Sequence, residues 1–273
     1  KMEYLKKNYL FWFYSIFVIV AHQIIFQSFF PNKNYFLGHD YSAGLPHLMF
    51  GKIWFNNNFL SVPWFSPSFC CGTPFFADPQ SSYYSFQQLF FILFSPITSL
   101  KLSFLFYSFI GFFGTFFLLR KSFKKNIYIS LIAASLFLFN GFINYRIIIG
   151  HFSFAGYAFI PFYCYFLIRS YENRILKSKS FFNILISSLL FANFVHSGSA
   201  AIIVTIMLSI IFVISIHIYL FEKVKIVNYL FFSIIIGLLI SSSKINAGFS
   251  FLDNFPRENS PLVFTSFYEL TAV

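Results

Sequence analysis

Two aspartates lie in the polar stretch that follows the first apolar run of the chain. Asp40 occurs in FLGHDYSAGLPHLMF and Asp78 in CGTPFFADPQSSYYSF, in a sequence with only eight acidic residues. A carboxylate can take a proton from a hydroxyl as a general base. Asp40 can instead cap the helix that follows it, and Asp78 can form a turn before Pro79. We favour the chemical role for Asp40, whereas for Asp78 both interpretations stay open.

Basic side chains and a histidine form a second group of candidates. Arg146 and His151 lie in NGFINYRIIIGHFSF, and Lys244 and Arg257 lie in SSSKINAGFSFLDNFPRENSP. Cationic donors of this kind hold phosphate oxygens and balance their charge. For Arg146 the simpler alternative is a contact with lipid headgroups.

The composition indicates where these side chains lie. The chain is 58% hydrophobic and 10% charged, with a mean hydropathy of +0.72. A soluble domain of this length would not have so apolar a surface. The net charge of +11 is explained by lysines that flank membrane spans, so no nucleic-acid partner is expected. The sequence predicts an all-α polytopic membrane protein.

Seven apolar runs are long enough to be read as spans, and an eighth is too short. The seven lie near residues 10–30, 102–119, 127–143, 154–168, 181–196, 199–221 and 226–243. The shorter run, 86–95, ends at Pro96 and is expected to be a re-entrant or interfacial helix. His22 and Gln23, inside the first run, are expected to hydrogen-bond between helices.

Basic clusters predict the orientation. Of the 19 Lys and Arg residues, 13 fall at the N-terminus or in alternate loops, at 120–125, 169–180 and 222–225. The positive-inside rule makes that side cytoplasmic. All three aspartates in the chain, which are Asp40, Asp78 and Asp253, then lie on the extracytoplasmic side. This asymmetry suggests that the outer face carries the chemistry.

The single long outer loop, 31–85, is rich in turn-forming and aromatic residues. Loops of this length are usually functional or disordered, and the aromatic content argues against disorder. We expect a packed interfacial layer in which 41–55 forms a helix. The last outer segment is 244–273. We treat 1–273 as one transmembrane module and expect it to be part of a longer protein.

This arrangement resembles the GT-C superfamily of membrane glycosyltransferases, and most closely its bacterial YfhO-like branch. The similar stretches are GTPFFADPQSSYYSFQQLFF in the first outer loop, GHFSFAGYAFIPFYCYFLIRS (150–170) and SSKINAGFSFLDNFPRE (242–258). The resemblance implies a GT-C-like core of about seven spans. It also implies transfer of a sugar from a polyprenyl-phosphate donor to a lipid or glycan acceptor, at the outer face of a bacterial inner membrane.

The resemblance also implies roles for the candidate residues. Asp40 would be the general base, with Asp78 as a further catalytic candidate. The phosphate would be held by Arg146, His151, Lys244 and Arg257. Some members of the superfamily use a divalent metal, but the chain has no Asp-x-Asp motif, so we assign no metal ligands and no cofactor.

Two alternatives from other classes remain. A transporter or flippase of a lipid-linked saccharide would place charged groups near the bilayer midplane, often within paired repeats. We find no internal repeat, and the ionisable residues gather at one face. A non-catalytic membrane assembly protein would leave the outer aspartates and cations pointing in unrelated directions.

Overall fold

The computed structural model describes residues 2–30, 40–68 and 72–254, and gives only the backbone for residues 2–8, 10 and 201. Arg257 lies outside the described residues, as do residues 31–39 and 69–71 of the predicted outer loop 31–85 and residues 255–273 of the predicted last segment 244–273. The elements in chain order are α1 (Met2–Gln27), α2 (Tyr41–Asn58), β1 (Phe65–Ser66), β2 (Thr73–Pro74), α3 (Phe86–Leu93), α4 (Pro96–Phe117), η1 (Leu118–Ser122), α5 (Ile127–Leu138), α6 (Gly141–Ile148), η2 (Phe152–Phe159), α7 (Ile160–Glu172), α8 (Lys177–His196), η3 (Ser199–Ile202), α9 (Ile203–Phe221), α10 (Ile226–Ile240) and α11 (Ser242–Asn254).

Within these ranges, five helical segments are long and apolar enough to cross a membrane. They are Pro96–Ser122, Ile127–Ile148, Phe152–Glu172, Lys177–His196 and Ile203–Phe221. A sixth is obtained if α10 and α11, which meet at an angle of 69°, form one broken span. Helix α1 has 26 residues, and its part Phe11–Gln27 is apolar. The chain is therefore an all-α, multi-pass membrane protein, with five or six such segments within the described residues; the predicted count of seven is not shown.

The predicted helices between the spans are present. The run at 86–95 forms α3, whose eight residues are too few to cross a bilayer. The stretch 41–55 lies within α2, and Tyr41, Leu45 and Leu48 are buried along one face of that helix. This spacing of four and three residues is the helical periodicity on which the prediction rested.

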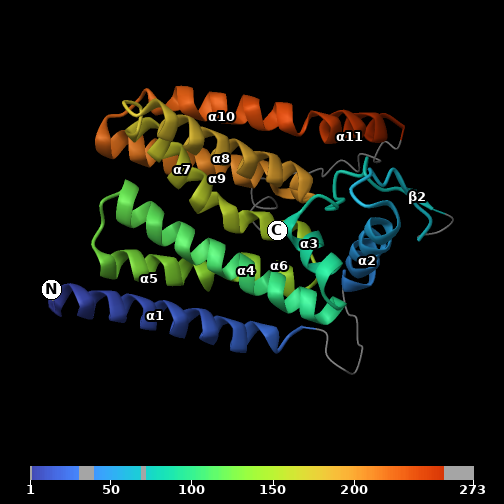
Figure 1. Cartoon of the computed structure of the whole chain (residues 1–273), viewed down its shortest axis with the longest axis horizontal. Helices are drawn as coiled ribbons and strands as arrows, with labels where there is room; N and C mark the ends of the chain where they lie inside the picture. The colour runs from blue at the N-terminus through green and yellow to red at the C-terminus, as the bar shows by residue number, and fades with distance from the viewer. Residues whose placement is uncertain (1, 31–39, 69–71, 255–273) are drawn as a thin grey trace, which may run out of the picture.

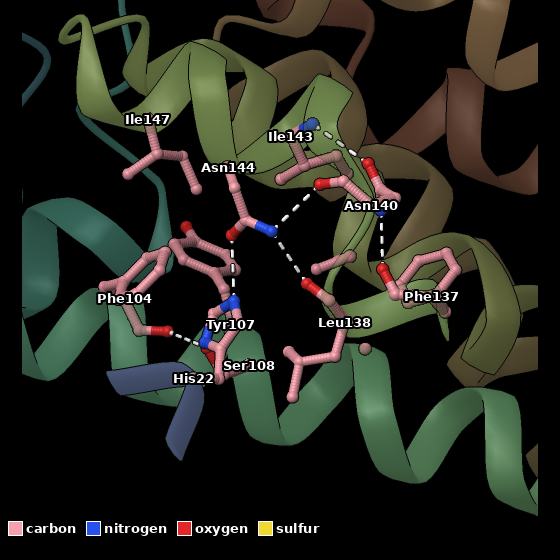
Figure 2. A pocket seen from close by; sticks show the side chains of 12 residues that line it. His22, Phe104, Tyr107, Ser108, Phe137, Leu138, Asn140, Ile143, Asn144 and Ile147 are labelled. Atoms are coloured by element: carbon pink, nitrogen blue, oxygen red, sulfur yellow. Dashed lines mark hydrogen bonds between the residues drawn. The ribbon is translucent and has the colours of Figure 1, made fainter. Parts of the chain in front are cut away.

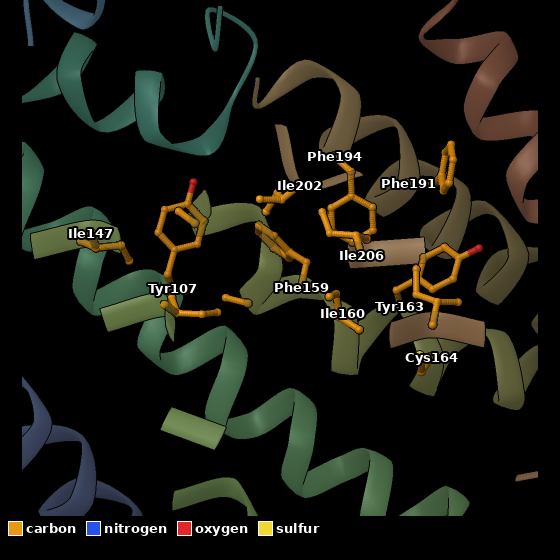
Figure 3. Close-up of a cluster of buried hydrophobic side chains, with 14 of the residues drawn as sticks. Tyr107, Ile147, Phe159, Ile160, Tyr163, Cys164, Phe191, Phe194, Ile202 and Ile206 are labelled. Carbon is orange, nitrogen blue, oxygen red and sulfur yellow. The ribbon is translucent and has the colours of Figure 1, made fainter. Parts of the chain in front are cut away.

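Helix α7 forms the centre of the bundle and packs on α4, α8, α9 and α10. Figure 3 shows Tyr163 and Cys164 of α7 near Phe191 and Phe194 of α8 and Ile206 of α9. Tyr163, Leu167 and Ile168 of this helix are fully buried. Cys164 is fully buried in this core as well.

A buried polar network joins α1 to the bundle (Figure 2). The Nε2 atom of His22 lies 2.8 Å from Oδ1 of Asn144 in α6, and Gln23 donates to Ser108 of α4 at 2.9 Å. Asn144 in turn donates to the carbonyl of Leu138 at 2.8 Å. The expectation that His22 and Gln23 hydrogen-bond between helices is confirmed.

The two ends of the bundle differ in structure (Figure 1). The loops after α4, α7 and α9, which carry the basic clusters, lie at the end where α1 begins. Helices α2, α3 and α11 and the hairpin of β1 and β2 form a layer at the other end. This layer has its own small core, in which Phe50, Phe75 and Tyr83 are buried together.

Candidate functional site

Asp40 immediately precedes α2, but its side chain does not cap that helix. Its backbone carbonyl accepts hydrogen bonds from the N–H groups of Ala43 (3.1 Å) and Gly44 (2.8 Å). The carboxylate makes no capping hydrogen bond. The alternative in which Asp40 serves as a side-chain cap is therefore wrong, because the main chain starts the helix and leaves the carboxylate to point elsewhere.

The partner of the Asp40 carboxylate is His151. Nε2 of His151 contacts Oδ2 of Asp40, and 59% of the aspartate side chain is exposed. On the other side of the ring, the Arg146 guanidinium lies 3.2 Å from Nδ1. Arginine can only donate, so Nδ1 is the acceptor and the ring proton is on Nε2, from which it is donated to Asp40. Arg146, His151 and Asp40 form one directed hydrogen-bonded chain.

A close approach of two backbone segments makes this pairing possible. The segment after α6 passes so near the start of α2 that a Cβ on Gly150 would lie 2.5 Å from the Tyr41 nitrogen. Gly150 also has a φ of +90°, which side chains other than glycine rarely adopt. The N–H of Asp40 donates to the carbonyl of Ile149 at 3.0 Å, and the Tyr41 hydroxyl donates to that of Ile147 at 2.9 Å.

Aromatic rings hold the other two members of the chain. The Phe154 ring stacks on His151 with its centroid 5.4 Å away, and the Arg146 guanidinium lies 4.8 Å from the same phenylalanine ring. Cation–π contact and stacking both restrict the orientation of the side chains they involve. Arg146 and His151 are therefore positioned before any ligand arrives.

Asp40 lines a cavity of about 480 Å³. This lies within the range of about 300–1,000 Å³ that is typical of small-molecule sites. Its walls come from the start of α2, from the loop before α3 and from the segment after α6: Asp40, Ala43, Gly44, His47, Leu48, Asp78, Gln80, Ser81, Ser82, Gly150, His151, Phe152, Ser153 and Phe154. The cavity thus brings together three of the predicted site residues, Asp40, Asp78 and His151.

Asp78 forms the expected turn, and its catalytic role stays a prediction. Its Oδ1 accepts the N–H of Gln80 at 2.8 Å, which is the side-chain turn expected beside Pro79. The residue also lines the cavity. The turn explains its local conformation, while its second carboxylate oxygen makes no hydrogen bond to another described residue.

Lys244 lies behind the cavity wall rather than on it. Its side chain is 4% exposed, and Nζ donates to the carbonyls of Phe76 and Asp78, both at 2.6 Å. It also lies 5.1 Å from the centre of the Phe76 ring. Lys244 therefore ties α11 to the loop that carries Asp78. Arg146, likewise, reaches the cavity only through His151.

His47 is a cavity residue that the sequence analysis missed. Its ring stacks on Phe75 at 5.5 Å, and burial lowers the pKa of the imidazole, against a smaller opposing effect of the Asp78 charge. The helical spacing held the signal, because residues 40, 44 and 47 share one face of a helix. The described residues hold no cluster of three or more His, Cys, Asp or Glu side chains that could bind a metal.

No protein-family model, curated protein or solved structure matches this chain. What the chain does must therefore be argued from the cavity and its lining.

Proposed function

We propose that this chain is a GT-C-type glycosyltransferase, or part of one, that moves a sugar from a polyprenyl-phosphate donor to an acceptor hydroxyl. The observation that carries the proposal is an exposed carboxylate, Asp40, held by a histidine at the mouth of a ligand-sized cavity. Helix α2, which lines the cavity, lies at the end of the bundle opposite the basic loops.

Asp40 acts as the general base. The acceptor hydroxyl attacks the anomeric carbon of the sugar, and Asp40 takes the hydroxyl proton as the new C–O bond forms. The bond from the anomeric carbon to the phosphate oxygen breaks, and its electron pair leaves with the phosphate. A phosphate is already a stable anion, so no general acid is needed. The N–H of His151 stabilises the ionised carboxylate before attack.

The lining of the cavity suits a sugar. Gln80, Ser81, Ser82 and Ser153 offer donors and acceptors for hydroxyl groups, and Phe152 supplies an apolar wall. Hydroxyls and amides of this kind fix the orientation of a polar ligand in an otherwise apolar site.

Among the described cations, Arg146 supports the phosphate site indirectly. It does not line the cavity, and its positive charge acts through the hydrogen bond of its guanidinium to His151. Lys244 contributes indirectly, because its ammonium is bonded to two loop carbonyls. Arg257 stays a candidate from the sequence alone.

The topology we propose places Asp40 at the extracytoplasmic face of a bacterial inner membrane. It counts α1 and the bent pair of α10 and α11 as spans, which brings the total to the seven of a GT-C core. The supporting observation is that the basic loops lie together at the opposite end, which the positive-inside rule makes cytoplasmic.

The bend between α10 and α11 favours one alternative function, a transporter or flippase of lipid-linked saccharides. Broken helices line the substrate sites of many transporters, and this pair is bent by 69°. In that case Asp40 would bind the saccharide without taking a proton. The lipid-linked sugar would then cross the bilayer unchanged.

The test is sugar transfer in membranes that contain the protein and a radiolabelled pool of polyprenyl-phosphate sugars. Asp40→Asn should lower the transfer rate by about 10² to 10⁴, the usual contribution of a general base. Asp253→Asn is the matched control, because Asp253 is an exposed aspartate of α11 outside the cavity lining. Normal transfer by Asp40→Asn, or movement of label across the bilayer without a new glycosidic product, would contradict the proposal.

A further inference from the structure

The end of the bundle that carries the basic loops has a large excess of positive charge. Its described loops and helix ends hold ten basic residues against two acidic ones, Glu172 and Glu222: Arg120, Lys121, Lys124, Lys125, Arg169, Arg174, Lys177, Lys179, Lys223 and Lys225. Among these residues the structure shows a single ion pair, between Arg169 and Glu172 at 2.7 Å. Most of this charge is therefore not neutralised within the described part of the chain.

An open hollow of about 350 Å³ lies at this end, where α7 gives way to α8. It is lined by Asn173, Ser178, Lys179, Phe182 and Asn183. The four polar side chains in this group are two carboxamides, a hydroxyl and an ammonium, and none of them hydrogen-bonds to another described residue. Each can donate to an anion placed between them.

Phe182 makes the hollow amphipathic. This ring is 60% exposed, and that of its neighbour Phe181 is 65% exposed. Both lie in the second turn of α8, a helix apolar enough to cross the membrane. A ligand in the hollow therefore has donors on one side and an apolar surface that leads into the hydrocarbon region on the other.

Two further cations lie against the ring of Tyr171. The Arg174 guanidinium and the Lys223 ammonium lie 4.5 and 5.8 Å from the centre of the Tyr171 ring. Tyr171 is two residues before Asn173 in the chain. These cations add to the positive potential around the hollow, which favours an anion over a neutral or zwitterionic group.

We propose that this hollow binds the headgroup of an anionic phospholipid from the adjacent leaflet. The phosphodiester takes hydrogen bonds from Lys179, Ser178 and the two asparagines, and the upper part of an acyl chain lies along Phe182. Basic pockets between spanning helices bind acidic lipid headgroups in this way. The proposal does not depend on the function of the Asp40 cavity at the other end of the bundle.

The experiment is native mass spectrometry of the purified full chain, released from neutral detergent with added phosphatidylglycerol or phosphatidylcholine. Phosphatidylglycerol should be retained and phosphatidylcholine should not. Lys179→Ala should weaken retention of phosphatidylglycerol about fivefold, since a lysine near an anionic lipid surface contributes about that factor. Lys177→Ala is the matched control, because Lys177 is exposed on the same turn but does not line the hollow.

Each of the other outcomes overturns the proposal. Equal losses for the two lysine variants would mean that a diffuse basic surface, and not the hollow, attracts the lipid. Equal retention of both lipids would exclude selection by charge. If inorganic phosphate or glycerol phosphate displaced phosphatidylglycerol at similar concentrations, the apolar wall would contribute nothing and the ligand would be a free phosphate. Because all variants lie on the surface, unchanged thermal unfolding should accompany each measurement.

Discussion

Gly150→Ala should disrupt the candidate site by forcing apart the two segments that bring Asp40 and His151 together. A Cβ at this position would lie 2.5 Å from the Tyr41 nitrogen and 2.9 Å from the Asp40 carbonyl carbon. Ordinary contact begins at 3.4 Å, so the segments must separate by about 0.9 Å. The hydrogen bond from Asp40 to Ile149, now 3.0 Å long, would be lost.

The cost follows from two contributions. A residue other than glycine at a φ of +90° carries about 1–3 kcal/mol of backbone strain. The lost hydrogen bond adds about 1 kcal/mol. Together they lower the free energy of unfolding by about 2–4 kcal/mol, which for a chain of this size corresponds to a fall of roughly 4–16 °C in melting temperature.

The assay is thermal unfolding of the purified protein in detergent, followed by circular dichroism at one heating rate. Gly141→Ala is the control, because a Cβ there meets nothing within 4 Å and Gly141 begins α6 with ordinary helical geometry. That substitution should leave the melting temperature unchanged or raise it slightly. If Gly150→Ala were as stable as Gly141→Ala, the close approach of the two segments would be refuted.

Two further predictions concern the cavity wall. Burial places the pKa of His47 in the folded state below its ordinary value of 6.5. As the pH drops below 6.5, the unfolded chain therefore binds more protons than the folded chain, and the stability should fall. His47→Phe should reduce the difference in melting temperature between pH 7.5 and 5.5. Lys244→Met should cost roughly 2–4 kcal/mol, because two loop carbonyls lose a buried charged donor. Lys52→Met, which removes a single exposed bond to Phe94, should cost under about 1 kcal/mol; equal melting temperatures for the two lysine variants would contradict this.

The spans could be predicted because membrane insertion depends on local composition. A run of apolar residues of sufficient length must be helical in a bilayer, since its backbone groups have no other partners. That argument needs no tertiary contact. It predicted both ends of α8 and α9, and the C-terminal end of α4, to within a few residues. The start of α4 was predicted later in the chain than Pro96, where the helix begins. It also separated the short α3 from the spans.

The bend between α10 and α11 was not predicted. The run 226–243 reads as continuous, but α10 ends at Ile240 and Lys244 lies within α11. Ser241 donates its hydroxyl to the carbonyl of Gly237, four residues earlier. Serine bonds of this kind often bend helices, although Ser108 and Ser170 make the same bond within unbroken helices. Composition alone does not reveal them, because serine is also common in straight spans.

The pairing of Asp40 with His151 was also beyond the sequence. The two residues are 111 positions apart, and their contact depends on how α6 ends and how α2 begins. Sequence reasoning chose both residues but gave His151 a direct role on phosphate, whereas its ring nitrogens are engaged by Arg146 and Asp40. The glycine before His151 was a usable signal, since a glycine between a span and a polar residue often marks a close backbone approach.

The cavity exists only when distant parts of the chain are docked together. Its loop wall is held from behind by Lys244 of α11. The turn after α8 packs against the same loop at Gly198, which has a φ of +75°. The two segments are so close that a Cβ on Gly198 would lie 2.2 Å from the Gln80 carbonyl oxygen. A substitution of Lys244 or Gly198 can therefore move Asp78 and Gln80 without placing any atom in the cavity. It follows that the geometry around Asp40 depends on helices α8 and α11, although neither contributes a residue to the cavity lining.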